Sequence, residues 1–241
     1  MRLNKVKERL KQVAFSALKH LPPNTAVNII WASTLPRDLI ERQRFTKALK
    51  GKGTKTEMDE SFYTQFQPHG QEAEIHTNDN QLRYEAIRNH IAGAVIEVGC
   101  ADGYFSRRFA REGHRTLGID TSSHFIKLAK SKAAAQALKN IRFRNANAED
   151  IPAKDCSFDT AFLGEILEHV ERPDRVVQET ARVVKPGGTI IITLPTHLMN
   201  TPDHVRTLVP KALKRMLSPV ADIESLRLLD FSHYVCIAKR K

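Results

Sequence analysis

The chain contains little cysteine. Three cysteines, Cys100, Cys156 and Cys236, stand at unrelated spacings among 241 residues, and no C-x-x-C pair is present. An odd count without such pairs supports neither a disulfide framework nor a zinc site. The sequence therefore predicts reduced thiols and a cytoplasmic location.

Long apolar runs and two common phosphate-binding motifs are also lacking. No uninterrupted apolar stretch approaches the ~20 residues of a membrane-spanning helix, and the N-terminus lacks the apolar segment of a secretory signal. Neither G-x-G-x-x-G nor G-x-x-x-x-G-K-[ST] occurs. These absences disfavour a membrane-spanning protein, a P-loop NTPase and a nicotinamide-dependent oxidoreductase.

Positive charge is concentrated near the N-terminus. Residues 1–56 hold thirteen Lys and Arg against three acidic residues, in a chain whose net charge is +11. Apolar positions of residues 2–21 fall largely on one helical stripe, which ends at Pro22. Such an arm favours a polyanion or an anionic membrane surface, to which the protein would be peripheral. The alternative is a stripe that packs on the rest of the chain.

We predict two parts, a basic helical arm with a lid or linker (1–80) and a larger domain (81–241). In the domain, strand patterns alternate with helix patterns, which predicts a mostly parallel sheet with helices on both faces. The last two strands follow each other without a helix and predict an antiparallel hairpin. Expected strands are 94–99, 115–119, 141–145, 158–163, 188–194, 225–230 and 233–238. Expected helices are 36–50 in the arm and 81–91, 104–112, 122–138, 173–184 and 209–217.

The most informative segment joins the first of these strands to a turn flanked by glycines. It reads V-I-E-V-G-C-A-D-G, with Glu97 two residues before Gly99, and Ala101 between Gly99 and Gly103. Glycine lets bare backbone approach a ligand that a Cβ would block, and Glu97 supplies an acceptor beside the turn. The segment predicts a nucleotide-type binding site.

An acidic residue, Asp120, ends the next expected strand. In nucleotide-binding α/β sheets an acid at this point accepts hydrogen bonds from ribose hydroxyls, and the two oxygens of a carboxylate suit a diol. The alternative is that Asp120 is the N-cap of the following helix.

Three later segments follow in the order A-E-D-I-P (148–152), S-F-D through L-E-H-V (157–170) and K-P-G-G (185–188). With the two features above, they resemble class I S-adenosylmethionine-dependent methyltransferases over roughly residues 90–240. Within that family, the similarity is nearest to the methyltransferases of ubiquinone and menaquinone biosynthesis. The resemblance implies S-adenosylmethionine as cofactor. It also implies an α/β, Rossmann-like, doubly wound sheet of seven strands, mostly parallel with an antiparallel last strand.

The resemblance also implies roles for single residues. The methionine part of the cofactor is lined by Glu97, Gly99, Cys100, Ala101 and Gly103, the ribose by Asp120 and Thr121, the adenine by Asn147 and Ala148, and the transferred methyl by Leu163 to Glu165. Two positions depart from the family pattern. Ala101 replaces the usual glycine, which is tolerated if its φ is negative. Asn147 replaces a frequent Asp, so its amide oxygen must serve as the acceptor.

Methyl transfer to a hydroxyl needs a base, and His169 is the first candidate, with Glu165 as the second. The alternative is that His169 is structural. Glu165, Glu168 and His169 share one face of a helical turn, and with His204 they could bind a divalent cation. We prefer the alternative that these acids form the solvated rim of the site, and we assign no metal.

The sequence says less about the methyl acceptor than about the cofactor. Mixed apolar and polar residues favour a small-molecule, lipid-linked or glycan-linked acceptor, methylated at oxygen. Two other functions stay open: an RNA methyltransferase that grips phosphates through residues 1–56, and a non-catalytic subunit that keeps the fold. The Glu97–Gly103 turn and Asp120 argue against the subunit, because a scaffold needs no ribose acceptor.

Overall fold

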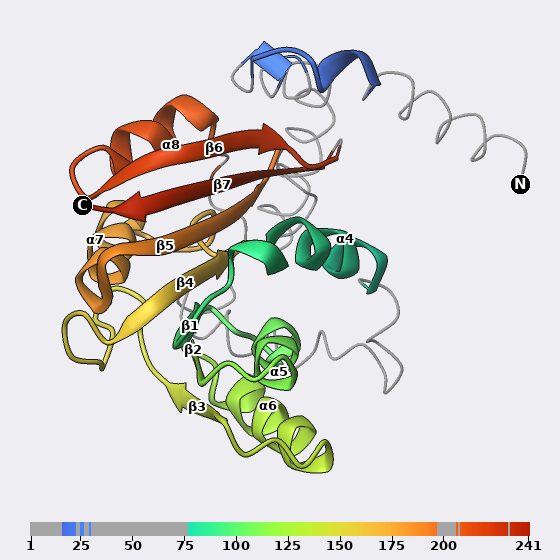
Figure 1. The fold of residues 1–241 in the computed structure, drawn as a ribbon, viewed down its shortest axis with the longest axis vertical. Helices are drawn as coiled ribbons and strands as arrows, with labels where there is room; N and C mark the ends of the chain where they lie inside the picture. Colours follow the sequence, from blue (N-terminus) through green and yellow to red (C-terminus); the bar gives the residue numbers. More distant parts are fainter. Residues whose placement is uncertain are drawn as a thin grey trace, which may run out of the picture.

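The computed structural model describes residues 16–22, 25, 26, 29, 77–196, 206, 208–230 and 232–241. Helices and strands alternate along most of the described chain (Figure 1). The elements are α4 (Thr77–Ile87), a 3-10 turn η1 (Arg88–His90), β1 (Val95–Val98), α5 (Tyr104–Arg111), β2 (Thr116–Asp120), α6 (Ser123–Ala135), β3 (Ile141–Asn145), β4 (Phe158–Gly164), α7 (Pro173–Val183), β5 (Val184–Pro195), α8 (Pro210–Leu217), β6 (Ala221–Leu228) and β7 (His233–Arg240).

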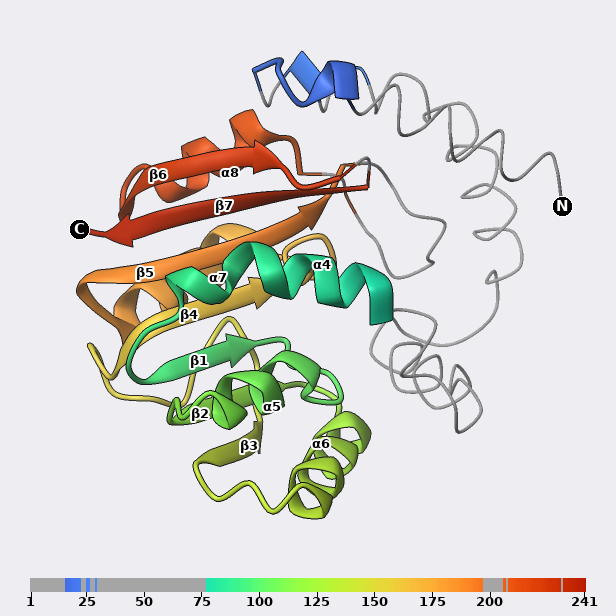
Figure 2. The ribbon, with the colours of Figure 1, turned by 45° about the vertical axis from the view of Figure 1, so that its right-hand side comes forward.

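The strands form one seven-stranded sheet in the order β3-β2-β1-β4-β5-β7-β6. β1 to β5 pair in parallel, whereas β7 runs antiparallel to both β5 and β6, as its reversed arrow in Figure 2 shows. The chain order reverses between β1 and β4, and open α/β sheets bind ligands beyond the carboxyl ends of the strands at such a point. The predicted fold class is confirmed.

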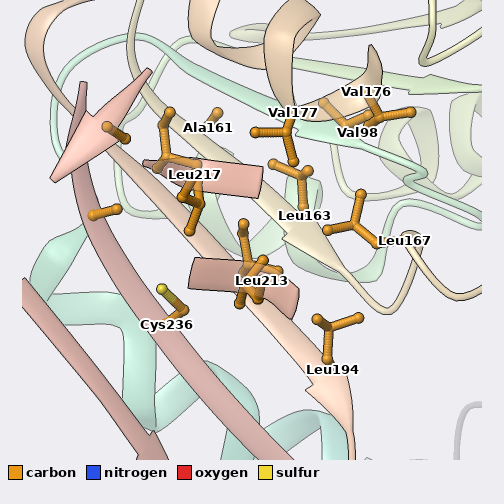
Figure 3. Close-up of a cluster of buried hydrophobic side chains, with 14 of the residues drawn as sticks. Val98, Ala161, Leu163, Leu167, Val176, Val177, Leu194, Leu213, Leu217 and Cys236 are labelled. Carbon is orange, nitrogen blue, oxygen red and sulfur yellow. The ribbon is translucent and has the colours of Figure 1, made fainter. Parts of the chain in front are cut away.

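Helices cover both faces of this sheet. α4 and α5 lie on one face (Figure 2). On that face Phe105 and Phe109 of α5 pack against Phe162 of β4. α7 and α8 lie on the other face, where Val177 and Leu213 meet apolar side chains of β4 and β5 (Figure 3). Because both faces are covered, β1 is buried at every residue, as expected for a central parallel strand.

Two strands start four residues before their predicted positions. β5 starts at Val184 instead of residue 188, because the Pro-Gly-Gly segment stays beside β4 through a register shift rather than forming a separate turn. β6 starts at Ala221 instead of residue 225. The first residues of this strand include exposed polar side chains, so the sequence shows no apolar run there.

Most of the predicted arm lies outside the described residues, including the expected helix at 36–50. Leu18 and Ala26 are described, and both are buried in the cluster that also holds residues of α7 and α8. For this part of the arm, packing on the domain is the better interpretation of the apolar stripe. Among the described residues, none of the helices is long and apolar enough to span a membrane. The division into 1–80 and 81–241 stays a prediction.

Candidate functional site

The turn after β1 is held by backbone hydrogen bonds to β2. The N–H groups of Gly99 and Cys100 both donate to the carbonyl oxygen of Ile119, at 2.9 Å each. Gly103 then donates to the Cys100 carbonyl at 2.7 Å and becomes the N-cap of α5. This closed turn lies at the carboxyl end of β1, beside the point where the strand order reverses.

Glycine is required in this turn for a reason that the sequence did not reveal. Gly99 and Gly103 both have φ +75°, in the left-handed region that favours glycine. A Cβ at Gly99 would lie 2.7 Å from Cδ1 of Ile166, and one at Gly103 would lie 2.6 Å from the Phe143 ring. The missing Cβ atoms therefore leave room for protein side chains as well as for a ligand. Through Ile166, the segment after β4 packs against the turn.

The backbone of Ala101 contradicts its predicted conformation. Its φ is +43°, whereas the sequence argument required a negative value. The conformation is imposed by the turn, because the Ala101 N–H donates to Oδ2 of Asp120 at 2.9 Å. A left-handed alanine costs about 1–2 kcal/mol, so this turn carries local strain.

Relieving that strain should stabilise the protein. We expect Ala101→Gly to raise the free energy of unfolding by roughly 0.5–1 kcal/mol, since glycine loses more chain entropy but has no left-handed penalty. Ala137→Gly, at φ +52°, should behave alike. The control Ala134→Gly, an exposed position inside α6, should lower it by about 1 kcal/mol. Urea titration measures all three. Equal destabilisation by the three variants would contradict the account.

Glu97 has a structural partner that the sequence did not predict. Its Oε2 accepts from the backbone N–H of Ser106 at 2.7 Å and also from the Ser106 hydroxyl. Ser106 lies in the first turn of α5, and Gly103 has no side chain with which to cap that helix, so Glu97 caps it from β1. Burial raises the pKa of Glu97 to about 8, against the opposing effect of these hydrogen bonds. Contact with the cofactor stays a prediction for this residue.

Asp120 links the glycine turn to the start of α6. Its Oδ2 binds the Ala101 N–H, and its Oδ1 accepts from the backbone N–H of Ser122 at 2.8 Å. The N-cap of α6 is Ser122, whose hydroxyl accepts from Phe125, so the N-cap alternative for Asp120 is wrong. Burial raises the pKa of Asp120 above its ordinary value, although both backbone hydrogen bonds and nearby His169 lower it. Each carboxylate oxygen keeps a lone pair for a further donor.

The predicted adenine side lies next to this carboxylate. The Ala146 N–H donates to the Asp120 carbonyl at 3.0 Å, which places residues 146–148 beside the end of β2. Oδ1 of Asn147 accepts from the Glu149 N–H at 2.9 Å and thus closes its own turn. Thr121 is exposed, and its carbonyl accepts from Asn145. The roles of Thr121, Asn147 and Ala148 toward a cofactor stay predictions.

Two predicted cofactor residues have side chains in the core. The Cys100 thiol is buried with Phe143 and Ala129, and burial raises its pKa above the ordinary value. The Leu163 side chain is fully buried in the main cluster (Figure 3). Only the backbone of these two residues could contact a ligand.

Glu165 lies in a charged network that the sequence analysis missed. Its Oε1 is 3.6 Å from Nη1 of Arg83 in α4 and 3.5 Å from Nε2 of His233 in β7. Nδ1 of His233 is in turn 3.1 Å from both carboxylate oxygens of Asp230. Burial opposes charge on His233, but its contacts with Asp230 and Glu165 raise its pKa to about 10. The pKa of Asp230 is lowered by His233 despite burial.

These contacts change the interpretation of the candidate divalent cluster. Glu165 has φ +56° and therefore does not belong to a helical turn, so the predicted shared face is wrong. Its carboxylate is directed at two cations, and Glu168 is fully buried, so the predicted solvated rim is wrong for Glu168. The ring Nε2 of His169 lies 3.9 Å from Glu168. In the described part of the chain, no three His, Cys, Asp or Glu side chains are placed to hold a metal ion, and His204 lies outside that part.

Comparison with known proteins agrees with the fold and the turn. Residues 96–192 match the family model described as "Methyltransferase domain". A "Ubiquinone biosynthesis O-methyltransferase" of Paracidovorax citrulli is 37% identical over 100 residues, which cover 41% of this chain and 42% of that protein. The protein of the same name from Xanthomonas oryzae pv. oryzae is 33% identical over 118 residues, or 48% and 49% of the two chains. The matches thus span less than half of these relatives.

Solved structures share the fold at low sequence identity. A methyltransferase from Aquifex aeolicus described as SAM-dependent superposes with a TM-score of 0.58 at 17% identity, covering 65% of this chain and 88% of that one. The [4+2]-cyclase SpnF gives a TM-score of 0.58 at 20% identity and coverage of 67% and 81%. The match over residues 96–192 agrees with the predicted resemblance to class I S-adenosylmethionine-dependent methyltransferases, a family that uses S-adenosylmethionine as co-substrate.

Proposed function

We propose that this protein is an S-adenosylmethionine-dependent methyltransferase that methylates a small-molecule acceptor at oxygen. The observation that carries the proposal is the bond from the Ala101 N–H to Asp120. This hydrogen bond joins the glycine turn to the carboxylate that we expect to bind the ribose. Both lie at the edge of the sheet where the strand order reverses, and doubly wound sheets bind nucleotides at such a point. The SpnF similarity shows that the fold alone does not fix an activity, so these residues are needed for the argument.

The described residues fit both ends of S-adenosylmethionine. Asp120 offers two acceptor oxygens for the ribose diol. Arg83 offers a cation for the amino-acid end, since its guanidinium lies 5.1 Å from the Phe105 ring centre, at the first turn of α5. The Arg83 Nε is buried and has no hydrogen-bond partner among the described residues. A buried donor without a partner is costly, and a ligand carboxylate would satisfy it.

Bound S-adenosylmethionine supplies an electrophilic methyl group on a sulfonium. The protein's task is to orient the acceptor, exclude water and remove a proton from a hydroxyl acceptor. His169 is our candidate for that base, because its ring is partly exposed, at 25%, and lies close enough to Asp120 to affect its pKa. Glu165 is less suited, because two cations already share its carboxylate.

The acceptor is proposed from the relatives. The curated proteins that match about half of this chain are named O-methyltransferases of ubiquinone biosynthesis, which supports a small molecule methylated at a hydroxyl. A role for residues 1–56 at an anionic membrane or on RNA rests on their charge alone.

We expect Arg83→Met to weaken binding of S-adenosylhomocysteine about 10- to 100-fold, since a charge-assisted hydrogen bond is worth about 1.5–3 kcal/mol. The matched control is Arg88→Met, whose side chain is half-exposed and paired with Glu85. Isothermal titration calorimetry measures both. 5′-Methylthioadenosine, which lacks the amino-acid end, should bind wild type and Arg83→Met equally. Equal losses for both ligands would contradict the assignment of Arg83.

The function itself is tested with wild-type protein. We expect micromolar or tighter binding of S-adenosylhomocysteine, and transfer of labelled methyl from S-adenosylmethionine to a member of a set of hydroxylated aromatic compounds. Binding without transfer to any compound, RNA included, would favour the non-catalytic subunit. No binding at millimolar ligand would reject the proposal.

A further inference from the structure

The turn between β6 and β7 reaches the same edge of the sheet as the glycine turn. Asp230 organises this turn: its Oδ1 accepts from the backbone N–H of Ser232 at 2.6 Å and of His233 at 2.7 Å. The same carboxylate binds the His233 ring. His233 is 2% exposed, so its imidazole is fixed in place from two sides.

From this position, His233 reaches the segment that follows β4. Its backbone pairs with Pro195 of β5, and its Nε2 extends to Oε1 of Glu165, whose own N–H donates to the carbonyl of Thr193. Glu165 adopts φ +56°, a costly conformation for a non-glycine residue. The next residue, Ile166, packs against Gly99, so the segment that carries Glu165 lies beside the glycine turn.

The same carboxylate oxygen also faces Arg83. The 3.6 Å separation is longer than the 2.7–2.9 Å of a direct charge-assisted hydrogen bond, and Nη1 of Arg83 also donates to Thr193 Oγ1 at 3.4 Å. Two cations therefore share one carboxylate. Because His233 satisfies part of the charge of Glu165, Arg83 is not drawn into a tight pair with that carboxylate. Nη2 of Arg83 donates to Oδ1 of Asn80, and the Nε–H has no partner among the described residues, so it is the donor left for a ligand.

We propose that His233, braced by Asp230, is a positioning residue for the cofactor: it acts through Glu165 to keep Arg83 available for the amino-acid carboxylate of S-adenosylmethionine. The inference rests on the proposed function. It makes the β6–β7 turn and His233, which lies 68 positions after Glu165 in the sequence, part of the active site. A purely structural histidine would affect every ligand of the site alike, whereas this role concerns only ligands that carry the amino-acid end.

The test is calorimetry on the full chain with S-adenosylhomocysteine and 5′-methylthioadenosine. His233→Gln should weaken the binding of S-adenosylhomocysteine about three- to tenfold, because it removes one residue of the coupled network. The binding of 5′-methylthioadenosine should stay unchanged. In the Arg83→Met background, His233→Gln should have no further effect, because its route to the ligand is gone. His114→Gln, an exposed histidine that contacts Gly93, is the control and should match wild type.

Each result separates the inference from the proposed function. If wild type binds neither ligand, the proposed function fails. If wild type binds, three results would overturn the inference. His233→Gln could bind S-adenosylhomocysteine with the wild-type affinity, it could lose affinity for both ligands equally, or its effect could add fully to that of Arg83→Met. Asp230→Asn should show the same selective loss and replaces His233→Gln, under the same criteria, should that variant not fold.

Discussion

Replacing Asp120 with asparagine should lower the affinity for S-adenosylhomocysteine about 10- to 100-fold, because hydrogen bonds to a charged group contribute about 1.5–3 kcal/mol. The effect has two sources. The amide offers one acceptor oxygen instead of two to the ribose diol. In addition, the amide NH2 must face the backbone N–H of either Ala101 or Ser122, and two donors that face each other cannot form a hydrogen bond. Both changes act on the nucleoside half of the ligand.

Asp222→Asn is the matched control, since that side chain is 77% exposed on β6 and binds only Lys241 in the described structure. It should bind S-adenosylhomocysteine like wild type. Asp120→Asn should also weaken 5′-methylthioadenosine, in contrast to Arg83→Met. Unchanged affinity of Asp120→Asn for both ligands would remove the ribose assignment and, with it, the observation on which the proposed function depends.

Replacing Glu97 with glutamine should remove most of the loss of stability that wild type shows between about pH 4.5 and about pH 8. The pKa of Glu97 rises from 4.5 to about 8 in the folded protein. A raised pKa means that the folded state holds the proton more tightly. The stabilisation is therefore complete below about pH 4.5 and is lost as the pH rises through about 8, by an amount of the order of 4 kcal/mol.

Glutamine keeps an acceptor oxygen for both Ser106 groups and carries no charge at any pH. Glu97→Gln should thus match wild type near pH 4.5 and exceed its unfolding midpoint at pH 8. Glu85→Gln, half-exposed on α4, should follow the wild-type profile. The loss that His233 contributes, between about pH 6.5 and about pH 10, should persist in both variants. Parallel profiles for Glu97→Gln and wild type would show that Glu97 is ionised when buried.

Regular elements of this domain were predictable because their sequence patterns are local. Val95 to Val98 and Ile190 to Leu194 are mostly apolar runs, which are typical of buried strands, and Pro173 begins α7 where a helix tolerates it. The strand ends were less predictable. β6 carries exposed polar residues along most of its length and is held as a strand by its pairing with β7.

Sequence alone determined the class of site: a short strand, a turn with glycines four residues apart, and an acid at the end of the next strand identify a nucleoside-binding edge. Those signals lie within 26 residues of one another and depend on backbone conformation and strand order, which local residues control. Only the tertiary structure revealed that Glu97 caps α5, that Ala101 is left-handed, and that Arg83, Glu165, His233 and Asp230 share one network. The reason is physical: a buried charge is stable only beside its partners. Here those partners come from α4, the segment after β4, the β6–β7 turn and the start of β7, which only the folded chain brings together.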